Sequence, residues 1–155
     1  MIQRIQTVYM LLAVALTIAC LCLQIGTYSA LGLPILNEYN LWLTDPLGAH
    51  HFTVWPLFAV LVLSATIGLC TIFMFANRKL QSRMCALNML LILCWYILYI
   101  VFSQTLTGII PEEAAFTFRP AIAATFPCVA SILYLMARKA IISDEKLVRA
   151  ADRIR

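Results

Sequence analysis

The sequence predicts an all-α membrane protein: a four-transmembrane-helix bundle with a short outer β-hairpin or irregular cap and a C-terminal amphipathic cytoplasmic helix. Composition is the first observation behind this prediction. Hydrophobic residues make up 63 % of the 155 residues and charged residues only 12 %, against about 45–50 % and about 25 % in soluble domains. A soluble domain of this size cannot bury so much apolar surface. A soluble enzyme, a disordered segment and a nucleic-acid-binding domain are therefore excluded, and the expected surroundings are a lipid bilayer.

Four long apolar runs are the second observation. A spanning helix needs roughly 20 apolar residues to cross the hydrocarbon core, and in lipid a helix satisfies all its own backbone hydrogen-bonding groups. None of the four runs contains Asp, Glu, Lys, Arg or His. Within them, Asn88 is expected to bond across helices, and Pro127 is expected to kink the last span. The chain is predicted to be one domain, residues 1–155, with spans at residues 5–24, 54–76, 84–104 and 120–137.

The distribution of charge between the runs is the third observation. Ten of the 11 basic residues lie before the first run, in the inner loop 77–83 or in the tail 138–155. Only Arg119 lies in the outer loops 25–53 and 105–119. Lys and Arg are enriched in the cytoplasmic loops of membrane proteins. We therefore expect a multi-pass protein with both termini in the cytoplasm.

The outer loops carry the polar groups that suggest a binding site. The run from Asp45 to Gly48, with Pro second, fits a type I turn, so a short β-hairpin or an irregular cap is expected there. Pro111 followed by two acids predicts a single helical turn. The candidate outer-face polar site consists of His50, His51, Glu112, Glu113 and Arg119.

The outer-face groups do not form a recognisable metal or catalytic motif. Adjacent histidines diverge on either a helix or a strand, and zinc sites need three or four convergent ligands. We therefore expect no metal, no cofactor and no catalytic residues. The simplest interpretation of these side chains is that they are polar groups at the membrane interface.

The tail is predicted to form a separate helix on the cytoplasmic face. Ser143 is a suitable N-cap, and the two acids after it suit the first turn of a helix. Basic residues lie largely on the other face from the apolar ones, a pattern that suits anionic lipids or a protein partner. Both alternatives stay open. The predicted docking residues are Leu147, Arg149, Ala151, Arg153 and Ile154.

Three segments of the chain carry a family resemblance. They are Met1–Tyr9, Asn77–Gln81 and the ending Asp144–Arg149 followed by Asp152–Arg155. The chain resembles an uncharacterised family of small four-span inner-membrane proteins of Bacteroidetes, a domain-of-unknown-function family, over essentially its whole length. The resemblance implies a bacterial inner (cytoplasmic) membrane location and four helices. It carries no activity and no catalytic residues.

Two functions from different classes fit these features. The first is a non-enzymatic accessory or scaffold subunit of a larger bacterial inner-membrane complex, with membrane-protein partner subunits docked on the tail. It rests on the basic tail and on the lack of a catalytic motif. The alternative is a small-molecule or lipid-handling membrane protein or enzyme that uses the outer-face polar residues. A stoichiometric partner in mild detergent favours the first, and a bound lipid, quinone or metal favours the second.

Overall fold

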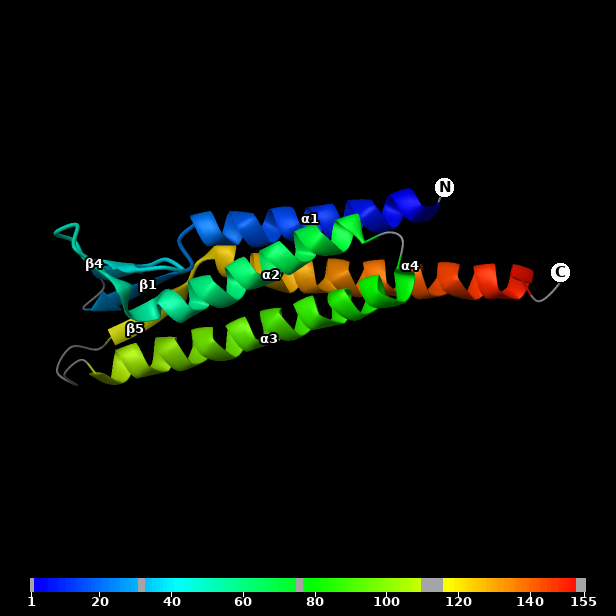
Figure 1. Cartoon of the computed structure of the whole chain (residues 1–155). Coiled ribbons are helices and arrows are strands. Elements are labelled where there is room, and N and C mark those ends of the chain that lie inside the picture. The colour runs from blue at the N-terminus through cyan, green and yellow to red at the C-terminus, as the bar shows by residue number, and fades with distance from the viewer. Residues whose placement is uncertain (1, 31–32, 75–76, 110–115, 153–155) are drawn as a thin grey trace.

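Four long helices lie alongside one another and end at a small antiparallel sheet in the computed structural model of the chain (Figure 1). The structure describes residues 2–30, 33–74, 77–109 and 116–152. The N-terminal and C-terminal ends of this part lie at the same end of the bundle, and the sheet lies at the other. The helices are α1 (Ile2–Cys22), α2 (Trp55–Phe73), α3 (Arg78–Ile109) and α4 (Phe126–Asp152).

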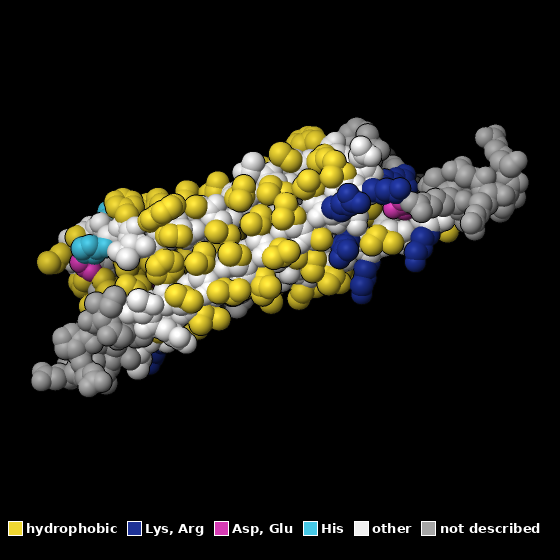
Figure 2. Space-filling model, turned by 60° about the horizontal axis from the view of Figure 1, so that its bottom comes forward, with side chains coloured by type: hydrophobic (Ala, Val, Ile, Leu, Met, Phe, Trp, Pro, Cys, Tyr) yellow, Lys and Arg dark blue, Asp and Glu magenta, His cyan; other side chains and the backbone are white. Residues whose placement is uncertain are grey.

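All four helices are long and apolar enough to cross a membrane. Their most apolar windows have mean hydropathies of 2.2, 2.2, 2.3 and 1.4 in chain order, and only 28–33 % of each window is buried inside the bundle. Hydrophobic side chains therefore cover the outside of the helices, as the yellow middle of Figure 2 shows. Such an apolar exterior is costly in water and favourable in lipid, so the structure is consistent with a multi-pass membrane protein.

The cap is a sheet, which is more than the expected short hairpin or irregular cap. Its strands are antiparallel and run in the order β4-β3-β2-β1-β5. The expected turn is present between β3 and β4, where Gly48 N donates to Asp45 O at 2.9 Å. Gly48 has φ +81°, a conformation that suits glycine. The strands are β1 (Gly26–Ala30), β2 (Leu33–Glu38), β3 (Leu43–Thr44), β4 (His50–His51) and β5 (Phe116–Pro120).

The segment predicted as the outer loop 105–119 is only partly a loop. Helix α3 continues to Ile109, and Phe116–Pro120 forms β5, which pairs with β1 along its whole length. The alternation of Phe116, Thr117, Phe118 and Arg119 is the period-two pattern of a strand. The predicted helical turn at Pro111 lies outside the described residues.

The predicted separate tail helix is wrong, because α4 runs without a break from Phe126 to Asp152. Ser143 lies inside this helix and caps nothing. The stretch after the span, residues 138–152, contains no Gly or Pro and is rich in good helix formers, so nothing stops the helix. The predicted kink is also wrong. Pro127 is the second residue of α4. Backbone N–H groups in the first turn of a helix have no intrahelical acceptor, so a proline there breaks no hydrogen bond.

One polar contact between the helices confirms the expectation for Asn88. Its side chain lies 3.1 Å from Ser64 Oγ, across the α2–α3 interface. In the amide orientation that satisfies all partners, Nδ2 donates to Ser64 O at 2.8 Å and Oδ1 accepts from Gly68 N at 3.2 Å. An amide buried among apolar helices thereby keeps its hydrogen bonds and holds the register of the two helices.

Candidate functional site

Asn40, just after strand β2, lies where the sheet meets the helices. Its Nδ2 donates to Cys20 O in α1 at 2.7 Å, and its Oδ1 accepts from Trp95 Nε1 in α3 at 3.0 Å. Its carbonyl accepts from Phe58 N in α2 at 3.1 Å. Asn40 is fully buried. One side chain and its own carbonyl therefore connect three of the four helices to the sheet.

Glu38, the last residue of β2, is a carboxyl group with no solvent exposure. Its Oε2 accepts a hydrogen bond from the Tyr28 hydroxyl at 3.2 Å, and its Oε1 has no hydrogen-bond partner among the described residues. Burial raises the pKa of Glu38 from 4.5 to about 7, against the smaller opposing effect of the Tyr28 hydrogen bond. Burial, and then the neighbouring Glu38, raise the pKa of Tyr28.

Aromatic rings fill the space around Glu38. The rings of Tyr28 and Phe118 lie 4.8 Å apart, those of Tyr99 and Phe118 lie 5.7 Å apart, and Trp95 stacks on Tyr99 at 5.1 Å. The Tyr99 hydroxyl donates to Ile25 O at 2.7 Å. We call Glu38, Asn40, Tyr28, Tyr99 and Trp95 the junction cluster. Its carboxyl group can take up and release a proton near neutral pH, and such a change of charge acts directly on the contact between sheet and bundle.

Sequence reasoning missed the junction cluster because no local pattern reveals it. Glu38 looks like one of several acids of the outer loop, and Asn40 is separated from Trp95 by 55 residues. The only available signal is the alternation of β2, which places Glu38 and Leu36 on the same face. That signal does not say what covers this face.

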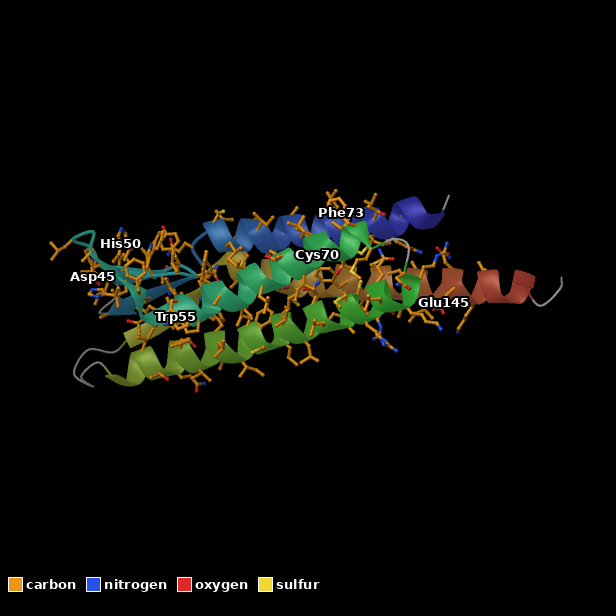
Figure 3. All side chains as sticks on the ribbon, in the orientation of Figure 1. Asp45, His50, Trp55, Cys70, Phe73 and Glu145 are labelled. Carbon is orange, nitrogen blue, oxygen red and sulfur yellow. The ribbon has the colours of Figure 1, made fainter. Side chains whose placement is uncertain are left out.

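The structure does not bring together the three candidate outer-face residues that it describes, His50, His51 and Arg119. His50 and His51 are exposed on the edge strand β4, where His51 Nε2 lies 2.8 Å from Asp45 Oδ2 and His50 Nδ1 lies 3.3 Å from Thr44 Oγ1 (Figure 3). Arg119 lies on β5, at the opposite edge, with three strands between. Glu112 and Glu113 lie outside the described residues. In the described part of the chain, no group of three or more His, Cys, Asp or Glu is placed to hold a metal ion.

Lys and Arg side chains gather at the end of the bundle away from the sheet (Figure 2). At this end, Gln6 Nε2 in α1 donates to Asp144 Oδ2 in α4. Asp144 is buried by this contact. We call this end the basic end, defined by Arg78, Lys79, Arg83, Arg138, Lys139 and Lys146.

Of the five predicted docking residues, the structure describes the side chain of one. Leu147 is 60 % exposed on α4. Arg149 and Ala151 fall in the last turns of α4, where the side chains are outside the described part, and Arg153 and Ile154 lie outside the described residues. The described portion therefore supports an exposed apolar position on the tail and leaves the basic face of the tail as a prediction.

A family model described as a domain of unknown function (DUF4293) matches residues 2–154. A search of curated proteins finds no match.

Proposed function

This chain belongs to the DUF4293 family of domains of unknown function, and for it we propose a role as a non-enzymatic accessory or scaffold subunit of a larger bacterial inner-membrane complex. One observation carries the proposal. Helix α4 continues past the other helices at the basic end (Figure 1). Near the C-terminal end of this helix, Leu147 has 60 % of its surface exposed. A rigid helical arm with an apolar side chain suits docking to a partner subunit.

The charge distribution supports an orientation for this arm. The basic end, with both termini, faces the cytoplasm if the positive-inside bias holds, and the sheet then faces outward. The resemblance to four-span inner-membrane proteins of Bacteroidetes supports the same membrane. The alternative function, small-molecule or lipid handling at the outer face, gains no support from the described residues, since His50 and Arg119 lie at opposite edges of the sheet.

Orientation is tested by labelling single cysteines in intact spheroplasts. A cysteine at Leu47, which is 97 % exposed in the β3–β4 turn, is expected to react with a membrane-impermeant maleimide from outside. A cysteine at the exposed Lys79, at the start of α3, is expected to react only after the membrane is opened. The parent chain measures the background from its own cysteines. Equal labelling of both positions in intact spheroplasts would contradict the proposed orientation.

Docking through α4 is tested by Leu147→Asp. A charged group in an apolar contact is costly, so recovery of a stoichiometric partner in mild detergent is expected to fall several-fold while membrane insertion is unchanged. The matched control is Leu47→Asp, which places the same charge on an exposed leucine at the other end of the molecule. Recovery should also survive high salt, because an apolar contact is not screened as surface charges are. Equal recovery from both variants and the parent would remove the support for docking at Leu147.

A further inference from the structure

A groove of about 400 Å³ lies between α1 and α4 at the basic end. Its walls include Ile5 and Tyr9 from α1, and Met136, Lys139, Ser143 and Asp144 from α4. Ile5 and Met136 are 52 % and 41 % exposed, so nothing in the described part of the chain covers the apolar portion. The groove is therefore an open, partly apolar surface at the depth where a spanning helix leaves the hydrocarbon.

The chemistry of the groove changes in a fixed order along α4. Met136 comes first, on the membrane side, followed by the cation Lys139, the hydroxyl of Ser143 and the carboxylate of Asp144. At a rise of about 1.5 Å per residue, Lys139 lies about 4.5 Å beyond Met136, and Asp144 lies about 7.5 Å beyond Lys139. An apolar wall, a cation and an anion thus follow one another from the membrane outward. A phospholipid with an amine in its headgroup has the complementary order of acyl chain, phosphate and ammonium.

Asp144 is held in place for such a contact. Gln6 Nε2 donates to its Oδ2, which ties the carboxylate to α1 across the end of the groove. Asp144 is 8 % exposed and Lys139 is exposed, so the anion is the fixed member of the pair and the cation the adaptable one. A long lysine side chain commonly reaches from an apolar surface to the headgroup region in this way.

We infer that this groove binds one phospholipid whose headgroup carries a primary ammonium group, with its phosphate on Lys139 and Ser143 and its ammonium on Asp144. The acyl chain lies over Tyr9 and Met136, on the membrane side of the Gln6–Asp144 contact. Asp144 discriminates between headgroups. It repels a headgroup that has only negative charge, and a quaternary ammonium has no N–H with which to bond the carboxylate. This inference does not depend on the proposed scaffold role.

The test uses the full-length protein in mixed micelles. These contain equal amounts of phosphatidylethanolamine, phosphatidylglycerol and phosphatidylcholine with the same acyl chains. Native mass spectrometry counts the lipids that stay bound. The ethanolamine lipid is expected to be retained about fivefold over each of the others, the ratio for one partly exposed ion pair. Lys139→Ala is expected to reduce retention of all three lipids, because each has a phosphate. Its matched control is Lys79→Ala, which removes an exposed lysine of the same end outside the groove.

Asp144→Asn separates headgroup selection from general lipid binding. The asparagine side-chain oxygen still accepts from Gln6 Nε2, so the α1–α4 contact is kept while the negative charge is lost. We expect this variant to bind the three lipids equally and to keep the melting temperature of the parent. Equal retention of the three lipids by the parent would overturn the inference, as would equal losses from Lys139→Ala and Lys79→Ala. A preference for the ethanolamine lipid that survives in Asp144→Asn would also overturn it.

Discussion

Gly68→Val is expected to prevent the bundle from packing. Gly68 lies in the C-terminal half of α2. A Cβ there would overlap the Tyr134 hydroxyl of α4 and lie 2.7 Å from Val14 Cγ2 of α1. Overpacking a tight core costs about 1–3 kcal/mol, and here two neighbouring helices must move at once. We therefore expect a loss of about 3 kcal/mol or more in the free energy of unfolding. The measurement is thermal or denaturant unfolding of the purified protein in detergent.

Tyr134→Phe provides the matched test of this packing. The Tyr134 hydroxyl is buried and has no hydrogen-bond partner among the described residues, so its removal is expected to leave stability unchanged or slightly improved. Gly68→Ala should be destabilising in the parent and less so in the Tyr134→Phe background, where the hydroxyl no longer stands in the way. The rescue is expected to be partial, because Val14 remains close. A Gly68→Val chain as stable as the parent would show that the α1–α2–α4 contact is loose.

Glu38→Gln is expected to remove most of the pH dependence of stability. The pKa of Glu38 is about 7 in the folded protein and 4.5 as the ordinary value. Between these values the folded chain holds a proton that the unfolded chain has released, so stability falls as pH rises through this window. The full stability is present below about pH 4.5, and no further loss is expected above about pH 7. The slope approaches about 1.4 kcal/mol per pH unit, which gives a total on the order of 3 kcal/mol.

Glutamine is a suitable replacement because its side-chain oxygen still accepts from the Tyr28 hydroxyl and it carries no charge at any of these pH values. The measurement is the free energy of unfolding in detergent from pH 4.5 to pH 8. The phenols of Tyr28 and Tyr99 also lie near Glu38. Burial raises the pKa of Tyr28 further away from this range. His50 and His51 are also ionisable side chains of the same sheet, so both chains should carry His50→Asn and His51→Asn. Parallel pH profiles for the two chains would show that Glu38 is not the titrating group.

Sequence reasoning predicts that four helices are present better than it predicts where each helix ends. The four spans follow from local composition, but their ends do not. Residues 84–104 became Arg78–Ile109 in α3, and residues 120–137 became part of Phe126–Asp152 in α4. An apolar run ends at the first charged residue. A helix continues past that residue as long as the following residues favour helical backbone conformation. Membrane-boundary charges such as Arg78 and Arg138 therefore lie inside helices.

The sequence by itself determined the properties that depend on neighbouring residues. These are the apolar spans, the separation of basic residues to one end, the turn at Asp45–Gly48 and the interhelical role of Asn88. The tertiary structure alone decided which distant groups meet. It pairs β5 with β1 and brings Asn40 to Trp95, 55 residues away in the sequence. It also brings Gln6 to Asp144, and Glu38 to the aromatic side chains of Tyr28 and Phe118. The physical reason is that hydropathy and propensity act over one or two turns of chain. The burial of a carboxyl group and the lining of a groove depend on elements far apart in sequence that pack together only in the folded bundle.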